Sequence, residues 1–220
     1  MKTLSCCLLI SILAAFPLLH ADDWPQGSGV KGNFQTQQSA QTEWSVARNQ
    51  NIVWKRELPE TGQSTPVVSR GKVFFTTMKP VTSDSKIGKD ISAWCCDAEN
   101  GAVLWKQEIV GKHPLKLSGC FGDSTGPPAV TDGQRVVFVN ASSGITCFSI
   151  DGKKLWHQDF LSVARGIPFL HDGKFIFTRQ IYPPEGDGRF PHKYAEAPKE
   201  MWTQLQALDM RTGEITWTSK

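Results

Sequence analysis

The 220-residue sequence predicts an all-β fold of repeated four-stranded antiparallel sheets, and three observations predict it. Short runs rich in β-branched and aromatic residues alternate with glycine-containing turns. The same order of runs and turns occurs three times, over residues 64–109, 126–160 and 167–220. In each unit a tryptophan follows the second glycine turn by four residues. Repetition of this kind is typical of proteins whose similar units stack on one another.

The turns between the first and second runs of the units predict β-hairpins. Asp132-Gly133 and Asp172-Gly173 favour a two-residue type I′ turn, because both central residues of that turn need positive φ. The first two strands of each unit are therefore expected to pair antiparallel.

The turns between the third and fourth runs follow two patterns. Asp151-Gly152 repeats the two-residue chemistry, whereas residues 97–101 and 209–213 suit a longer turn that a left-handed glycine closes. Two kinds of turn are thus expected at one hairpin position.

A four-stranded sheet of this kind cannot bury both faces alone, so the sequence predicts a β-propeller whose blades stack face to face. The tryptophans would then be wedges between about three blades. Ordinary core aromatics of a β-sandwich are the alternative, but they do not explain four tryptophans at equivalent positions. Residues 51–57 copy a fourth strand and are predicted as the strand that closes a ring. The predicted docking residues are Trp54, Asp97, Gly101, Trp105, Asp151, Gly152, Trp156, Ala207, Asp209, Thr212, Gly213 and Trp217.

The N-terminus predicts export. Lys2 precedes an apolar stretch over residues 4–19, and Ala21 offers a small residue for cleavage, so residues 1–21 are predicted as a signal peptide. A retained membrane anchor is the alternative, but the stretch is shorter than the ~20 residues of a spanning helix. The exported chain would begin with a lead segment at residues 22–50 and lie in the periplasm or outside the cell.

Composition argues against several other classes. The net charge is +3 and the lysines are scattered, so no nucleic-acid partner is expected. The cysteines of the exported part match no zinc motif, and one disulfide would suit an oxidising compartment, with its pairing left open. These cysteines are Cys95, Cys96, Cys120 and Cys147. The histidines are dispersed without the neighbouring carboxylates of a zinc or triad site, and are expected at the surface. They are His113, His157, His171 and His192.

The last repeat resembles a known family. Residues 207–217 look like a complete tryptophan-docking motif of PQQ-repeat, quinoprotein-type propellers, with Ala, Asp, Thr, Gly and Trp in place. The first unit departs from the motif at Cys95 and Asn100, and the second unit has a shortened turn. The resemblance covers about residues 24–220.

The resemblance implies one of two functional classes. Quinoprotein dehydrogenases of the family bind PQQ and calcium on the axis of an eight-bladed ring and oxidise alcohols or sugars. Other members bind no quinone and act as scaffolds, among them a lipoprotein that assists insertion of β-barrels into the outer membrane.

The residues favour the scaffold class. Alcohol-oxidising members carry a disulfide between adjacent cysteines near the first strand of a blade, whereas Cys95-Cys96 lies in the docking motif of the third and fourth strands. The pair is therefore interpreted as two small apolar strand residues. No segment matches the calcium ligands or the catalytic aspartate. The prediction is a non-catalytic exported scaffold without a cofactor, and a fragment of a PQQ- and calcium-dependent dehydrogenase is the alternative.

Loop length predicts the binding face. The long connections span residues 78–91, 110–125 and 180–201 and share one rim of the predicted blades. This rim is expected to bind a protein or glycan partner, with simple solvated loops as the alternative. The candidate contact residues are His113, Phe121, Tyr182, Arg189, Phe190, His192 and Tyr194.

Three blades and one strand are too few for a ring of about four to eight blades. The sequence is therefore expected to be the N-terminal part of a longer propeller, with an assembly of partial rings as the alternative. Open strand edges and bare blade faces predict self-association.

Overall fold

The computed structural model describes residues 23–36, 42–79, 87–88, 90–112, 115–116, 124–142, 144–159, 166–180 and 203–219. The predicted signal peptide at residues 1–21 lies outside these ranges. Every regular element within them is a strand. A search of these ranges finds no helix of the length and apolarity needed to cross a membrane.

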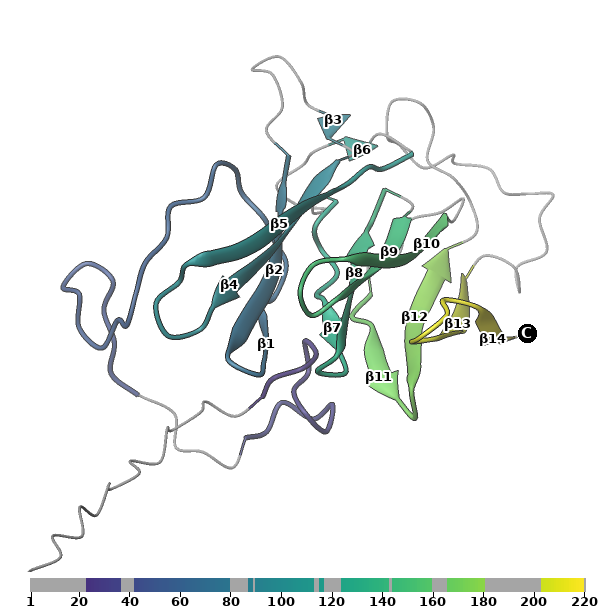
Figure 1. The fold of residues 1–220 in the computed structure, drawn as a ribbon, viewed down its shortest axis with the longest axis horizontal. Coiled ribbons are helices and arrows are strands. Elements are labelled where there is room, and N and C mark those ends of the chain that lie inside the picture. Colours follow the sequence, from purple (N-terminus) through teal and green to yellow (C-terminus); the bar gives the residue numbers. More distant parts are fainter. Residues whose placement is uncertain are drawn as a thin grey trace, which may run out of the picture.

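The described residues form three four-stranded antiparallel sheets and one short two-stranded ladder, which confirms the predicted fold class (Figure 1). The first sheet has the order β1 (Val67–Ser69), β2 (Lys72–Met78), β4 (Ile91–Asp97) and β5 (Val103–Ile109). The second has the order β7 (Val130–Thr131), β8 (Arg135–Asn140), β9 (Gly144–Ser149) and β10 (Lys154–Asp159). The third has the order β11 (Phe169–His171), β12 (Lys174–Gln180), β13 (Thr203–Asp209) and β14 (Ile215–Thr218). Each sheet is a four-stranded blade of a propeller.

The three sheets stand side by side in chain order (Figure 1). β7 contacts both β1 and β11, so the first strands of the sheets meet, while the fourth strands lie at the opposite edges. The strands β1, β7 and β11 are termed the inner strands. The turns that join strands one to two and three to four lie at one end of each sheet, the tight-turn end. The opposite end, where the second strands end and the third strands begin, is termed the loop end.

The core lies between neighbouring sheets, and the middle sheet contributes both of its faces. Val136 and Phe138 of β8 belong to the cluster shared with the first sheet, which includes Phe74. Val137 and Val139 belong to the cluster shared with the third sheet. Because successive strand residues point to opposite faces, a strand buried on both sides needs a continuous apolar run. Full burial of each such side chain contributes about 1.5–3 kcal/mol.

Two of the hairpins between first and second strands turn as type I′. Asp172 and Gly173 have φ values of 48° and 67°, as predicted for this dipeptide. Arg70 and Gly71 take the same conformation, with φ values of 50° and 69°.

The type I′ prediction for Asp132-Gly133 is wrong. The register of β7 and β8 centres the turn on Gly133 and Gln134, and of these two only Gly133 has a positive φ, 81°. Positive φ at the first central residue alone is the pattern of a type II′ turn. The cause is the Asp132 carboxylate, whose Oδ1 accepts hydrogen bonds from the backbone N–H groups of Gln134 and Arg135 at 2.8 and 2.6 Å. This Asx-type contact shifts the turn by one residue.

The two-residue prediction for Asp151-Gly152 is also wrong. The ladder between β9 and β10 leaves a three-residue loop at 150–152, in which only the glycine has a positive φ, 88°. This is the hairpin in which a left-handed residue follows a tight turn. Residues 97–101 and 209–213 form the longer turns with a left-handed glycine, as predicted.

Two of the long connections meet at the loop end. β3 (Ile87–Gly88) and β6 (Leu115–Lys116) pair antiparallel. They belong to the connections over residues 78–91 and 110–125, which were expected to be loops. The short ladder therefore joins the two connections (Figure 1).

Residues 51–57, which are predicted as the strand that closes a ring, form no ladder with the strands of the described ranges. Residues 52–58 have no regular secondary structure. A strand requires a partner along its backbone, and none of the strands in the described ranges pairs with this segment. The segment nevertheless places Trp54 against the first sheet, as described below.

The described cysteines are buried free thiols. Cys95, Cys96 and Cys147 lie in β4 and β9 and form no disulfide, whereas Cys120 lies outside the described residues. Burial raises the pKa of Cys95 and of Cys147 to about 12. Both values mark thiols that stay protonated and unreactive, as is usual for cysteine in an apolar core.

Candidate functional site

The tryptophans of the repeats contact the sheet that follows them in the chain. Each of three indole N–H groups donates to the carbonyl of the first residue after a third strand. The bonds join Trp54 to Ala98 at 2.8 Å, Trp105 to Ile150 at 3.0 Å and Trp156 to Met210 at 3.1 Å. Trp54 therefore makes the contact of a fourth-strand tryptophan without belonging to a strand.

A glycine lies beneath each of these rings. Added Cβ atoms at the three glycines would lie only 2.6–2.7 Å from the nearest ring atom. The pairs are Gly101 with Trp54, Gly152 with Trp105, and Gly213 with Trp156. The same glycines have φ values of 72°, 88° and 76°. Glycine is thus required for two reasons, because the ring leaves no space for a side chain and the backbone is left-handed.

A second hydrogen bond, which the sequence analysis missed, accompanies each ring. The side chain two residues after the tryptophan donates to the carbonyl of the glycine under the ring. The bonds join Arg56 to Gly101 at 2.8 Å, Gln107 to Gly152 at 3.1 Å and Gln158 to Gly213 at 3.1 Å. The spacing Trp-x-Arg/Gln is visible in the sequence and would have identified these residues.

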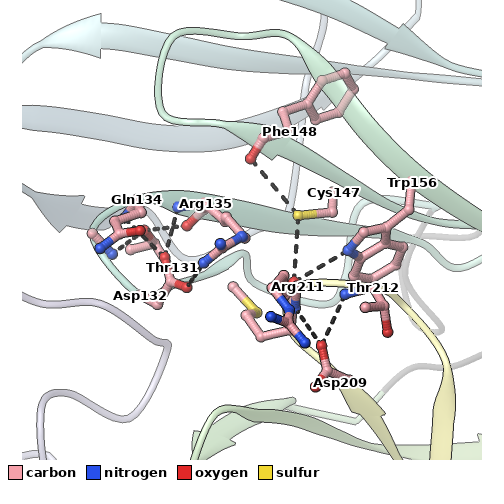
Figure 2. A network of polar contacts seen from close by, with 12 residues as sticks. Thr131, Asp132, Gln134, Arg135, Cys147, Phe148, Trp156, Asp209, Arg211 and Thr212 are labelled. Atoms are coloured by element: carbon pink, nitrogen blue, oxygen red, sulfur yellow. Dashed lines mark hydrogen bonds and ion pairs between the residues drawn. The ribbon is translucent and has the colours of Figure 1, made fainter.

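The predicted aspartates hold two of the turns. Asp209 Oδ1 accepts the N–H groups of Arg211 and Thr212, both at 2.8 Å (Figure 2). Asp97 Oδ1 makes the same contacts in the first sheet. The hydrogen bond from the backbone of Thr212 is the main cause that lowers the pKa of Asp209. Within the described chain Asp151 accepts no such bond, because its turn is shorter.

The last two predicted docking residues lie in the third sheet. Ala207 is fully buried and pairs with Trp217 across β13 and β14. Trp217 is 40 % exposed, and no further sheet covers it among the described residues.

The predicted binding face lies outside the described residues. This applies to His113, Phe121, Tyr182, Arg189, Phe190, His192 and Tyr194.

One histidine departs from the prediction that the histidines lack carboxylate neighbours. His157 Nε2 lies 2.9 Å from Asp159 Oδ1, and its Nδ1 lies 2.8 Å from Thr146 Oγ1. Lys112 Nζ completes the chain at 2.7 Å from Asp159 Oδ2. Residues 157 and 159 share one face of β10 because strand side chains alternate, and this spacing is visible in the sequence.

This polar chain connects structural elements and does not form a hydrolytic site. Burial alone would raise the pKa of Asp159, but hydrogen bonds from Lys112 and His157 outweigh burial and hold it below its usual value. Thr146 is only 2 % exposed, so its hydroxyl offers no accessible nucleophile. The ion pair of Lys112 with Asp159 ties the connection after β5 to the outer strand of the second sheet.

The lead segment crosses all three inner strands. The backbone of Trp24 exchanges two hydrogen bonds with Val68 of β1, at 2.7 and 2.9 Å. The carbonyl of Pro25 then accepts the N–H of Thr131 in β7 at 2.8 Å. Sequence reasoning had no signal for these contacts, because they join residues far apart in the chain.

The side chain of Gln26 connects the lead segment to the third inner strand. Its Oε1 accepts the backbone N–H of Leu170 in β11 at 2.8 Å, and its Nε2 donates to the carbonyl of Gly29 at 2.8 Å. The loop that follows is closed by a 2.8 Å bond from the N–H of Phe34 to the carbonyl of Ser28. One buried amide thus fixes this loop against β11.

An open cleft of ≈ 600 Å³ lies between this loop and β11, and is termed the inner cleft. Its lining includes both apolar and polar residues from the two segments. The lead segment contributes Gln26, Ser28, Val30, Lys31, Gly32 and Phe34, and the third sheet contributes Ile167, Phe169, Leu170 and His171.

The contacts of a tryptophan with the glycine turn of the next sheet are termed joints. Their repetition defines the class of this protein. Each sheet receives a tryptophan of the preceding unit on a left-handed glycine, and this is a β-propeller built from PQQ-like repeats. The family model described as "Outer membrane protein assembly factor BamB" matches residues 89–220, more than half of the chain. The chain belongs to this family.

Two solved structures are similar to parts of this chain. BamB from Moraxella catarrhalis is 14 % identical, with a TM-score of 0.43 over 79 % of this chain and 56 % of that one. The quinohemoprotein alcohol dehydrogenase from Comamonas testosteroni is 15 % identical, with a TM-score of 0.43 over 73 % of this chain and 21 % of that one. The chain therefore spans about half of the first structure and a fifth of the second. No curated protein sequence matches it.

Proposed function

We propose that the chain is a non-catalytic, exported scaffold that binds a protein partner in the assembly of outer membrane proteins, through its loop end. The family description names outer membrane protein assembly, which supports the general role. The observation that carries the proposal is the fixation of connections at the loop end. The ladder of β3 with β6 and the ion pair of Lys112 with Asp159 both hold connections there. Binding loops are commonly held in this way on a rigid scaffold.

The proposed role requires no cofactor, and this separates it from a dehydrogenase. Incubation of the purified chain with PQQ and calcium chloride is expected to give neither bound quinone absorbance nor dye-linked oxidation of alcohols. Appearance of either signal would contradict the scaffold role.

The binding face is tested by photo-crosslinking to an outer membrane β-barrel polypeptide diluted from urea. A photoreactive phenylalanine analogue replaces Tyr182 or Tyr194, in the longest predicted loop of the loop end. The control position is Arg211, which is exposed in a turn at the tight-turn end. We expect the polypeptide to be captured from positions 182 and 194 and not from 211. Equal capture from all three positions, or capture from the control alone, would refute the assignment of this face.

A further inference from the structure

The third inner strand has an open backbone edge where the first inner strand is covered. Val68 and Leu170 occupy equivalent positions, each two residues before a type I′ turn. Val68 uses both its N–H and its carbonyl to pair with the backbone of Trp24. The N–H of Leu170 reaches the side chain of Gln26, while no described residue donates to the Leu170 carbonyl. An unpaired strand edge is a template for another extended chain.

The Gln26 side-chain amide, which occupies part of the β11 edge, indicates which chemical groups this edge binds. The Gln26 amide oxygen takes the N–H of Leu170 at 2.8 Å. On β1 the same role belongs to the backbone carbonyl of Trp24, at 2.9 Å from the Val68 nitrogen. On β7 it belongs to the carbonyl of Pro25. The inner strands thus form hydrogen bonds with amide and peptide groups at their edges. The edge of β11 can pair with one more peptide group, through the Leu170 carbonyl.

Exposed apolar side chains surround this edge. Val30 is 57 % exposed, Phe34 66 %, Ile167 55 % and Phe169 40 %, and all four line the inner cleft. A strand that adds to a sheet edge directs alternate side chains to one side, where apolar pockets select them. The cleft therefore offers an apolar wall beside the open backbone groups.

Phe34, which lines this wall, has an unfavourable backbone conformation. Its φ is 57°, in the left-handed region that costs a bulky residue free energy and that Asn or Gly occupies more readily. Strain of this kind tends to persist at binding sites. An exposed aromatic ring in a strained backbone, beside a cleft, points to a ligand for that ring.

The charge of the cleft indicates the class of ligand more narrowly. Lys31 supplies a positive charge, His171 lines the cleft beside it, and the described lining residues include no carboxylate. A segment with an acidic group or a terminal carboxylate is therefore favoured over a basic one.

We propose that the inner cleft binds an extended peptide segment that carries large apolar side chains and adds to β11 as a strand. The N–H of the bound segment would donate to the Leu170 carbonyl, and an apolar side chain would lie between Phe34 and Phe169. The cleft lining shares no residue with the predicted binding loops at residues 78–91, 110–125 and 180–201, so the proposal stands apart from the proposed function.

The probe is a fluorescein-labelled peptide of alternating threonine and phenylalanine, six residues long, with a free terminal carboxylate. Binding to the full chain is followed by fluorescence anisotropy. Two further peptides carry N-methyl groups, either on every threonine or on every phenylalanine. Strand addition exposes only one of these sets to the β11 edge. We expect one N-methylated peptide to lose at least tenfold in affinity and the other to bind as the parent does. Equal binding of all three peptides, or no binding of the parent, would overturn the proposal.

The matched variants are Phe34→Asn and, as control, Val53→Asn. Phe34→Asn removes the ring and suits the left-handed backbone, so the peptide is expected to bind about tenfold more weakly while the Tm stays equal or rises. Val53 is exposed and lies outside the cleft lining, so its replacement should leave affinity unchanged. If Phe34→Asn dissolves a self-associated form and the parent peptide does not bind, the occupant is a second copy and the peptide proposal is wrong. If peptide binding is lost while crosslinking at positions 182 and 194 is intact, the proposed function stands and the cleft proposal fails. If crosslinking is lost while the peptide binds, the cleft proposal stands and the proposed function fails.

Discussion

The second and third sheets end in the same kind of strand, but only one of the two tryptophans is covered. Trp156 on β10 donates to the Met210 carbonyl and rests on Gly213 of the next sheet. Trp217 on β14 follows its glycine at the same spacing, yet it is 40 % exposed. The difference shows that the motif does not bury its own tryptophan. The sheet that follows supplies both the hydrogen-bond acceptor and the surface beneath the ring.

This comparison assigns the tryptophan to the interface between sheets. In arrays of repeats, stability is approximately the sum of the stability of each unit and of the contacts between neighbours. Trp105 and Trp156 therefore belong to the neighbour contacts, whereas Trp217 contributes mainly to its own sheet.

The largest expected effect comes from removing a covered ring. Trp156→Ala is expected to lower the free energy of unfolding by about 4 kcal/mol, because it opens a cavity between the second and third sheets. Trp217→Ala removes a ring that no other sheet of the described residues covers, and about 1 kcal/mol is expected. Urea unfolding monitored by circular dichroism measures both changes. Equal losses for the two variants would show that the coverage of Trp156 contributes nothing.

The next effect separates backbone strain from steric contact. Gly213→Ala places a methyl group 2.6 Å from the Trp156 ring at a φ of 76°, and about 3 kcal/mol of destabilisation is expected from strain and overpacking together. Gly173 has a similar φ, 67°, but nothing within 4 Å of an added Cβ. Gly173→Ala should therefore cost only about 1 kcal/mol. Urea unfolding compares the two variants. If Gly173→Ala lowers the free energy of unfolding as much as Gly213→Ala does, contact with the Trp156 ring does not cause the destabilisation.

The joints could be predicted from sequence because their signals are local and repeated. Glycine, turn and tryptophan recur at a fixed spacing, so the stacking of four-stranded sheets follows from the pattern alone. The turn registers at Asp132 and Asp151 could not be predicted from dipeptides. In the first case a side-chain hydrogen bond moved the turn, and in the second the ladder left one more residue in the loop.

The inner cleft could not be predicted, because its parts lie far apart in the sequence. The bond between Gln26 and Leu170 joins residues 144 positions apart. No repeat or motif of the chain marks Val30 or Phe34, whose exposure and positive φ are visible only in the folded chain. The lead segment carried no functional prediction, although it is the segment that reaches all three inner strands.

A smaller effect tests the second hydrogen bond of the joint. Gln158 Nε2 donates to the Gly213 carbonyl at 3.1 Å, in addition to the bond from Trp156. Gln158→Ala is expected to cost about 1 kcal/mol, the usual net contribution of a partly buried hydrogen bond. Gln134 is exposed in a turn, so Gln134→Ala serves as the control with a change near zero. Identical unfolding midpoints for the two variants would mean that the glutamine of the joint is dispensable.

The smallest expected effect is the acid dependence of the Asp209 turn. Backbone N–H groups of Thr212 and Arg211 lower the pKa of Asp209 in the folded chain, whereas the unfolded value lies near the usual ~3.9. A depressed pKa contributes stability that is complete above the unfolded value and is lost as the pH falls through the folded value. Asp209→Asn keeps an oxygen acceptor but removes the titration, so the fall in the urea midpoint between about pH 5 and pH 2 should become shallower than in the parent chain. Asp151→Asn is the matched control for the loss of a turn carboxylate, because in the described chain the Asp151 carboxylate accepts no turn N–H. A parent-like profile for Asp209→Asn would show that the charge of the turn adds no stability, and that the backbone bonds alone hold the surface on which Trp156 rests.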